Sequence, residues 1–261
     1  MKIAVCIKQV VTREWQLRVN DAKTWIRDQD ASFELNEPDA YALEEALRLK
    51  EKHTGEVVVV SAGPPRVAQV IREALARGAD RAIHVEADTL AAADAATVAD
   101  AIASAIRDEK FDLVLTGLQS DDQGFGQVGV VLAEKLGMPH ATIIMEVQAS
   151  ESPSTGSGLA ALRVKRELEG GWFQWISLPL PALLTIQSGI NQLRYATLKG
   201  IMAAKKKEIR KVALPGGLQP SQQIVALALP VRSKQTQMIT GSPAEAAKEL
   251  VRRLREEARA L

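Results

Sequence analysis

Short, almost uninterrupted apolar runs alternate with amphipathic stretches from Ile3 to Val147. The runs are rich in β-branched residues and have no polar face, which is typical of strands buried on both sides of a sheet. The pattern therefore predicts a series of central strands. They fall at residues 3–10, 57–61, 82–86, 112–116 and 141–147.

The stretches between these runs carry apolar residues at helical spacing. In the first of them Ala40, Leu43 and Leu47 share one face, and Asn36 precedes it as an N-cap. An alternation of strands and helices predicts an α/β fold, an open and mostly parallel sheet with helices on both faces. Helices are predicted at 38–52, 66–77, 89–107 and 126–136, and the glycines at 55, 78 and 137 suit left-handed C-caps.

The pattern changes after Ser150. Residues 162–168 alternate between apolar and polar, the pair Gly170-Gly171 forms a turn, and residues 172–178 return as a second strand. Residues 181–187 form a further apolar strand. We expect an antiparallel hairpin that extends the sheet, with Trp172 and Trp175 packed on its faces or, as the minority alternative, available for stacking.

From about Lys205 the regular pattern is lost. Residues 214–223 are rich in Pro, Gly and Gln and read as an arm, and residues 243–261 read as a helix with Ser242 as cap. Two domains follow: an α/β nucleotide-binding domain at 1–212, and a C-terminal arm and helix at 213–261. An isolated amphipathic helix suggests docking on another chain, although folding back on its own domain is equally open. Its apolar face holds Ala247, Leu250, Val251 and Leu254.

Composition narrows the function classes. The net charge of +1 provides no global attraction to nucleic acid or to membranes. The single cysteine, Cys6, excludes an intramolecular disulfide and fits a reducing compartment, and the three separated histidines lack metal-ligand spacing, so no metal is expected. No apolar run approaches the roughly 20 residues of a membrane span. The chain begins directly in a strand, so we expect no targeting segment, no membrane insertion and a cytoplasmic location.

Three segments follow strands or precede a helix where a parallel sheet binds ligands: 60–64, 116–129 and 36–39. The second is glycine-rich, and a helix that starts near Gly126 offers free N–H groups to a phosphate. The alternative is a simple connection, because the glycine spacing matches neither of the common phosphate-binding fingerprints. No catalytic group is expected, since Asp121 and Asp122 are neighbours that seldom converge.

Apolar Leu198, Ile201 and Met202 lie next to the lysine run 205–207. The ordinary interpretation of such a run is a solvated basic loop. The sharper one is a docking surface whose apolar anchors meet an acidic partner. Nucleic acid is weakly supported, because one short basic run stands in a nearly neutral chain.

Several of these segments together resemble the signature of electron-transfer flavoprotein β subunits. The resemblance covers most of the chain and is weakest after about residue 212. It rests on Val164–Gly171, Leu180–Thr185, Asn191, Arg194–Leu198 and Ile201–Lys207, and in the N-terminal half on Val5–Lys8, Asn36, Ala42–Ala46, Val60–Pro64, Ala79–Ala82 and the loop at 117–129.

The resemblance implies an adenine-nucleotide α-hydrolase-like fold and an αβ heterodimer in which the 213–261 arm docks on the α subunit. The α subunit would hold most of the FAD, at the subunit interface, and this chain would hold a structural AMP. The chain would then be an electron carrier, not an enzyme. It would take electrons from acyl-CoA or related dehydrogenases in fatty acid β-oxidation and pass them through a quinone oxidoreductase to the respiratory chain. The alternative is an electron-bifurcating member, with FAD in place of AMP and NADH as donor.

Positions that match the family's motifs carry its roles. Two departures stand out: Asp121-Asp122-Gln123-Gly124 replaces a stretch that often reads Ile-Asp-Asp-Asp, and Thr12-Arg13 replaces Asp-Tyr. The implied nucleotide contacts are Cys6, Asn36, Asp39, Ala62, Gln119, Ser120, Asp121, Asp122, Gly124, Gly126, Gln127, Val128 and Gly129. The implied partner contacts, on the family's recognition loop, are Tyr195, Leu198, Ile201, Met202, Lys205, Lys206 and Lys207.

Overall fold

A computed structural model describes residues 1–151, 159–231 and 236–260 of the chain. The chain divides into two compact units, Met1–Leu227 and Ala228–Leu261, which are described separately. None of the helices in the described ranges is both long and apolar enough to cross a membrane.

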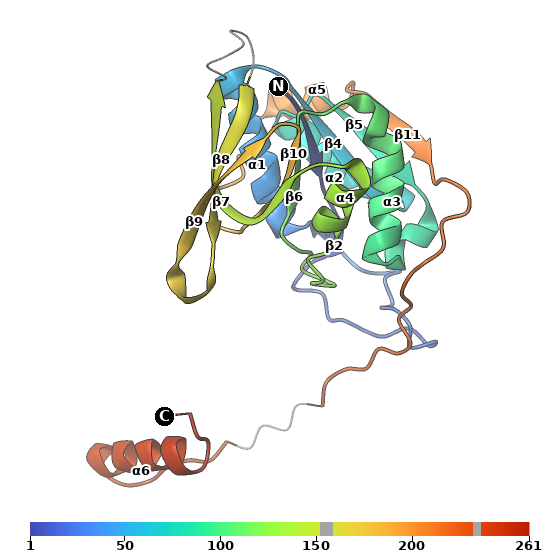
Figure 1. Cartoon of the computed structure of the whole chain (residues 1–261). Helices are drawn as coiled ribbons and strands as arrows, with labels where there is room; N and C mark the ends of the chain where they lie inside the picture. The colour runs from blue at the N-terminus through green and yellow to red at the C-terminus, as the bar shows by residue number, and fades with distance from the viewer. Residues whose placement is uncertain (152–158, 232–235, 261) are drawn as a thin grey trace. The chain divides into compact units, whose positions relative to one another are not determined.

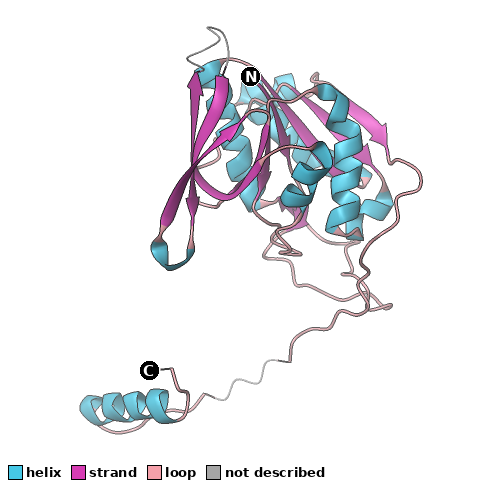
Figure 2. Cartoon of the chain, in the orientation of Figure 1, coloured by secondary structure: helices cyan, strands magenta, loops and turns pink. Residues whose placement is uncertain are grey.

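A nine-stranded sheet forms the centre of the first unit, in the order β11-β5-β4-β1-β6-β10-β7-β8-β9 (Figures 1 and 2). It is parallel from β11 to β7, and β8 and β9 continue it antiparallel. β2 and β3 pair separately. The strands are β1 (Lys2–Cys6), β2 (Gln9–Val11), β3 (Phe33–Leu35), β4 (Glu56–Gly63), β5 (Arg81–Glu86), β6 (Leu113–Gly117), β7 (His140–Glu151), β8 (Leu159–Glu167), β9 (Phe173–Pro179), β10 (Ala182–Ile186) and β11 (Ile209–Ala213).

Helices cover both faces of the parallel part of the sheet. Five α-helices belong to the described part of the first unit: α1 (Glu37–His53), α2 (Ala68–Arg77), α3 (Ala95–Ile106), α4 (Val128–Leu136) and α5 (Leu198–Ala204). Short 3-10 turns accompany them: η1 (Pro65–Val67), η2 (Asp88–Ala92), η3 (Arg107–Glu109) and η4 (Glu169–Gly171).

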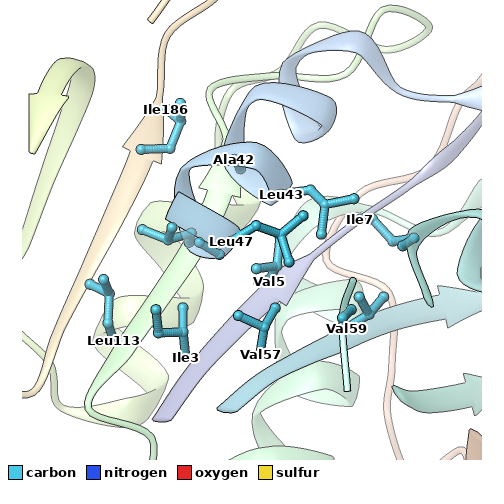
Figure 3. Close-up of a cluster of buried hydrophobic side chains, with 14 of the residues drawn as sticks. Ile3, Val5, Ile7, Ala42, Leu43, Leu47, Val57, Val59, Leu113 and Ile186 are labelled. Carbon is cyan, nitrogen blue, oxygen red and sulfur yellow. The ribbon is translucent and has the colours of Figure 1, made fainter. Parts of the chain in front are cut away.

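Alternate residues of each central strand enter different cores, because successive side chains of a strand point to opposite faces. In β1, Ile3 and Val5 pack with α1 and α2, whereas Ala4 and Cys6 pack with α3 and α4. Figure 3 shows Leu43 and Leu47 of α1 lying over the first of these faces. Burial on both sides explains the uninterrupted apolar runs in the sequence.

The predicted fold class is confirmed, including the antiparallel hairpin of β8 and β9 around Gly170-Gly171. Two predicted elements are shorter than expected. The first strand ends at Cys6 and the chain pairs again as β2, and the long helix predicted at 89–107 is divided into η2 and α3. Asp94 causes the second break, because its side chain accepts the N–H of Thr97 and caps α3.

Two of the predicted glycine caps differ from expectation. Gly137 ends α4 in the left-handed conformation, with φ 66° and ψ 33°. Gly78 caps α2 with φ 131° and ψ −2°, outside that region. After α1 the C-cap residue is Thr54, at φ 52°, and Gly55 follows it, also in positive φ at 153°.

The loss of order expected from Lys205 is wrong. Residues 198–204 form α5, and Ile209–Ala213 form β11, which pairs in parallel with β5. The next residues also lie on the first unit, because Asp94 Oδ2 accepts the N–H groups of Ser221 and Gln222. The domain boundary after residue 212 stays a prediction, and the first compact unit extends to Leu227.

The second unit contains the predicted terminal helix as α6 (Pro243–Glu256). Ser242 and Glu245 form a reciprocal capping box at its start, as the Ser-x-x-Glu spacing allows. Its Leu250 and Val251 are exposed within this unit. Residues 232–235 and 261 of the predicted arm and helix lie outside the described residues.

Candidate nucleotide site and partner surface

A pocket lies at the carboxyl ends of β1, β4 and β6. The strand order reverses at β1, whose neighbours are β4 on one side and β6 on the other. Such a switch point is where open parallel sheets bind ligands. The predicted residues that line the pocket are Cys6, Asn36, Asp39, Ala62, Gln119, Ser120, Gly126, Gln127, Val128 and Gly129.

The first turn of α1 holds this end of the sheet together. Buried Asp39 accepts the N–H of Lys8 at 2.7 Å and that of Gly117 at 2.9 Å, so one carboxylate joins the ends of β1 and β6. Asn36 is the N-cap residue of α1 by position, but its side chain does not cap the helix. It donates to the carbonyl of Gln119 and accepts the N–H of Asp121, which fixes the loop that follows β6.

Burial dominates the titration of two groups in this pocket. It raises the pKa of Asp39 to about 7, against the hydrogen bonds from the N–H groups of Lys8 and Gly117. Burial, with the nearby charge of Asp39, also raises the pKa of the Cys6 thiol. Cys6 therefore stays a protonated thiol, and its place in the wall agrees with a small core residue, not a nucleophile.

Two glycines allow backbone and helix to come close here. A Cβ on Gly117 would lie 2.4 Å from Asp39 Oδ1 and 2.7 Å from the carbonyl carbon of Pro38. A Cβ on Gly129 would lie 2.6 Å from Thr116 Oγ1, so α4 could not pack on the end of β6. These glycines serve the packing that forms the pocket, whereas Gly124 and Gly126 adopt positive φ in its loop.

The amino end of α4 opens into the pocket. The helix begins at Val128, two residues later than predicted, and its N-cap residue Gln127 makes no capping hydrogen bond with its side chain to any described residue. The first N–H groups of a helix lack intrahelical partners and carry a partial positive charge. Together these N–H groups can bind a phosphate by donating hydrogen bonds to it.

Part of the pocket wall is apolar and comes from the segment of η2 and α3. Sequence patterns place these residues on a helix but give no sign that they face a ligand. The wall suits a flat, weakly polar group such as a nucleobase, since pockets of this kind combine apolar walls with few polar groups. Its residues are Leu90, Ala91, Ala93, Ala95, Val98 and Ile102.

Lys8 is the charged residue that sequence reasoning missed. Its Nζ lies 2.6 Å from Asp122 Oδ1, 3.0 Å from Gln123 Oε1 and 3.3 Å from Ser120 Oγ, so it gathers the loop after β6 across the pocket mouth. Burial opposes the ionisation of Asp122, but the Lys8 charge and hydrogen bonds lower its pKa. No local signal marked it, because the predicted first strand at 3–10 contains Lys8.

Three of the predicted nucleotide residues do not line this pocket: Asp121, Asp122 and Gly124. Asp121 and Glu37 instead form ion pairs with Arg13, which stands where the sequence departs from the family's Asp-Tyr. Asp122 faces an adjoining pocket, which shares Lys8 with the first and reaches Arg66 and Phe33. Ligand binding by all these residues stays a prediction.

The predicted apolar and aromatic partner residues lie on α5 and just before it, and the predicted lysines follow it. Tyr195, Leu198 and Met202 are 90%, 84% and 63% exposed, and Ile201 is 44% exposed. Thr197 caps the helix through the N–H of Gly200. Gly200 lies against α2 so closely that its Cβ would lie 2.2 Å from the carbonyl oxygen of Ala76. One side of α5 is thus fixed to α2, and the apolar side chains point outward.

Polar anchors hold this segment from within. Arg194 bonds Glu44 and Glu51 of α1, and Asn191 donates to the carbonyl of Tyr41 and to Glu45. Although burial opposes it, these bonds from Arg194 lower the pKa of Glu44.

Lys207 belongs to these inner anchors by its contacts. Its ammonium donates to the carbonyls of Leu75 and Ala79 at 3.0 and 2.5 Å, at the end of α2. Lys205 and Lys206 are exposed. Of the three lysines predicted to meet a partner, Lys207 is thus held by other described residues of this chain.

A doubly wound α/β chain with a pocket at its switch point is the class that fold and site define. Within it, the model of the electron transfer flavoprotein domain matches residues 24–216. Proteins named electron transfer flavoprotein subunit beta are 36% identical in Methylophilus methylotrophus, over 98% of both chains, and 33% identical in Bacillus subtilis, over 100% of both. The human protein of that name is 38% identical over 84% of this chain and 83% of its own.

The chain belongs to the electron transfer flavoprotein family, among its β subunits. The resemblance drawn from the sequence signature is thereby confirmed. Membership gives the chain a role in electron transfer as part of a flavoprotein.

Proposed function

We propose that this chain is the β subunit of an αβ electron carrier that holds AMP in the switch-point pocket and helps to enclose FAD carried mainly by the α subunit. The observation that carries the nucleotide assignment is the start of α4, without a side-chain cap from the described residues, which lines the same pocket as an apolar wall. The start of α4 can bind a phosphate, and the apolar wall can bind a base. The flavin supplies the redox chemistry, and the protein binds, orients and shields it.

The residues present fit an adenine nucleotide. The amides of Gln127 to Gly129 would hold the phosphate, and Lys8 adds a positive charge at the mouth. The side chains of Asn36 and Asp39 form hydrogen bonds with backbone groups of this chain. Their role is therefore to shape the pocket rather than to bind the nucleotide through those oxygens.

Extraction of the nucleotide from the purified heterodimer tests this assignment. We expect stoichiometric AMP, identified by mass spectrometry. Gly126→Val should lower its retention, because a β-branched residue is strained at φ 62° and blocks the approach to the pocket. Gly124→Val is the matched control: its φ is 65°, but it does not line the pocket. Equal AMP loss in both variants, or none in Gly126→Val, would refute the assignment.

A second candidate is the electron-bifurcating type, with FAD in this chain and NADH as donor. It is favoured by the adjoining pocket, which shares Lys8, Ala62, Leu90 and Ala91 with the first and so leaves room for a ligand longer than AMP. Arg13 argues against it, since it ties Glu37 to Asp121 beside this space. The same extraction distinguishes the two, because it would then release FAD in two equivalents per heterodimer.

The α subunit is the proposed partner of the second unit. That unit carries Leu229, Val231, Met238, Leu250 and Val251 as exposed large apolar residues. Such residues on a short arm and an amphipathic helix are suited to docking in a groove of another chain. The chain expressed alone should therefore be unstable or aggregate, and a monodisperse stable monomer would contradict this pairing.

We propose that electron donors dock on the α5 surface, formed by Tyr195, Leu198, Ile201 and Met202. The proposed donors are acyl-CoA dehydrogenases or related dehydrogenases. The carrier would pass electrons to a quinone oxidoreductase and the respiratory chain, in fatty acid β-oxidation and in the cytoplasm. Leu198 is the central anchor, because it is large, apolar and 84% exposed on a rigidly held helix.

Leu198→Ala should reduce affinity for the dehydrogenase about thirtyfold, corresponding to about 2 kcal/mol for a buried anchor. Steady-state electron transfer at varied heterodimer concentration measures this effect. Leu17→Ala, which truncates an exposed leucine elsewhere, is the control. An unchanged rate would remove Leu198 from the partner site, and a large drop in melting temperature would assign it to the core.

A further inference from the structure

β9 is an edge strand without the features that normally protect one. It ends the sheet, and no described strand pairs with its outer side. Its seven residues, Phe173–Pro179, include no charged side chain, its one proline stands at the last position, and its pairing with β8 has no bulge. Proteins protect exposed edges with charges, prolines, bulges or short strands, because a bare edge recruits other strands.

The outward backbone groups of β9 can be assigned from its pairing. Trp172 gives its carbonyl to the N–H of Leu168 at 2.8 Å, next to the pair Glu167–Phe173. In an antiparallel ladder, hydrogen-bonded and non-hydrogen-bonded pairs alternate. The N–H and C=O groups of Phe173, Trp175 and Ser177 therefore point away from β8. Those of Gln174, Ile176 and Leu178 point toward it.

Aromatic side chains gather at this edge. The chain has only four Trp, two Tyr and four Phe, yet Trp172, Phe173 and Trp175 stand within four positions and are 74%, 46% and 38% exposed. Tryptophan is enriched at the energetic centres of protein interfaces. An uncharged edge lined by exposed rings is thus suited to a strand of another chain.

The charges beside the edge indicate the chemistry of that chain. Arg163 lies over the ring of Trp175 at 4.5 Å and Lys165 over that of Phe173 at 4.1 Å. Neither cation has an ion pair among the described residues. The carboxylates closest in register, Glu146 and Glu167, accept hydrogen bonds from Gln148 and Gln187. A second copy paired through this edge would add the same two cations, whereas acidic side chains would complement them.

We propose that β9 accepts an extended strand of a different polypeptide, which adds to the sheet and places acidic side chains over Arg163 and Lys165. This inference rests on the proposed function, because we assign that strand to the α subunit of the heterodimer. Backbone bonds from Phe173, Trp175 and Ser177 provide the attachment, and the flanking rings and cations select the sequence of the partner strand.

Residue-resolved amide hydrogen exchange in the intact heterodimer tests the inference within one strand. The inward amides of Gln174, Ile176 and Leu178 are the internal reference. We expect the outward amides of Phe173, Trp175 and Ser177 to exchange as slowly as this reference. Fast outward and slow inward exchange in an intact heterodimer would overturn the inference and leave the proposed function standing.

Ser177→Pro removes one outward N–H and should weaken the heterodimer about tenfold, the effect of one lost hydrogen bond of roughly 1.4 kcal/mol. Ser177→Ala keeps the N–H and should bind like the parent chain. Equal binding by all three would contradict the proposal. If no heterodimer forms from the parent chains, the proposed function fails, and with it the assigned partner. Slow outward amides in a particle of twice the heterodimer mass that Ser177→Pro halves would instead identify a second copy as the occupant.

Discussion

At one edge of the sheet, β11 has five residues and carries Arg210 and Lys211, whereas β9 at the other edge has seven residues and no charge. Figure 1 shows the two strands on opposite sides of the first unit. Arg210 bonds Glu109 at 2.8 Å and Lys211 bonds Glu86 at 2.7 Å. A short strand with fixed cations can stay exposed, but a longer neutral one is a liability unless it is covered. The contrast suggests that β11 is a closed edge and β9 an attachment site.

The β11 edge is also the better anchored of the two within the chain. Glu109 accepts hydrogen bonds from Lys2, Arg81 and Arg210, each at 2.8 Å, and so joins β1, β5 and β11. At β9 the cations stack on rings instead and form no ion pairs with described residues. One edge therefore satisfies its charges internally, and the other leaves them for a partner.

The largest effect is expected at the centre of the β11 network. Glu109→Gln removes a charge that three cations share, and charge-assisted hydrogen bonds contribute roughly 1.5–3 kcal/mol. We expect the free energy of unfolding to fall by about 2 kcal/mol, measured by urea denaturation of the heterodimer. Glu134→Gln, on the exposed side of α4, is the control. A loss of unfolding free energy equal to that of the control would show that the network does not stabilise the fold.

The same variant predicts a pH dependence. The Lys2 and Arg81 partners lower the pKa of Glu109 from 4.5 to about 2 in the folded chain. A depressed carboxylate pKa stabilises the fold above the unfolded value and loses that contribution as the pH falls. The difference between parent and Glu109→Gln should thus be full above pH 4.5 and shrink toward pH 2. A difference that stays constant over this range would contradict the assignment.

The next effect concerns the neutral edge itself. Trp175→Lys places a charge on β9, as natural edge strands do, and loses the stacking with Arg163. We expect about 1 kcal/mol less stability, from the lost cross-strand and cation–ring contacts, together with weaker binding of the α subunit. Titration with the α subunit measures the second effect, with Trp175→Phe as control. Unchanged binding would show that β9 is not the attachment site.

A smaller effect isolates the cation over the ring. A double-mutant cycle of Arg163→Met and Trp175→Leu should give a coupling of about 0.5–1 kcal/mol in unfolding free energy. The same cycle measured in heterodimer affinity should exceed this value if an acidic partner strand meets Arg163. Zero coupling in both measurements would contradict both the cation–ring contact and the proposed acidic partner strand.

The two edges also explain where the sequence could be interpreted and where it could not. β9 was predicted as the return strand after the Gly170-Gly171 turn, because it has no charged residue and few polar ones. β11 was missed because Arg210 and Lys211 separate Ile209 from Val212, so the residues that protect the edge also hide the strand signal. A strand of this kind is defined by its pairing with β5, which no local pattern contains.

The site divides in the same way. The loop at 116–129 was recognisable from its glycines, and most of the predicted residues share one pocket. Asn36 was identified as a helix cap, yet its side chain bonds a loop more than 80 positions away, as the Asn36–Gln119 bond shows. Lys8 reads as part of a strand and Lys207 as part of a basic run, and only tertiary contacts give them their roles.

Lys211→Val should cause the smallest change in stability. It also tests the comparison most directly, because it removes a charge from β11 and makes that edge more like β9. Lys211 is 64% exposed and its pair with Glu86 is of the kind that contributes under about 0.5 kcal/mol, so the unfolding free energy should stay within that margin. The variant strand has one cation fewer and higher strand propensity, which makes β11 resemble β9. We expect the heterodimer to self-associate at concentrations where the parent does not, measured by light scattering. Lys211→Arg keeps the charge and should behave like the parent. If Lys211→Val also stays monodisperse, then Arg210 and the short length of β11 are sufficient protection, and the absence of charge on β9 is a weaker sign of a partner than its length and its rings.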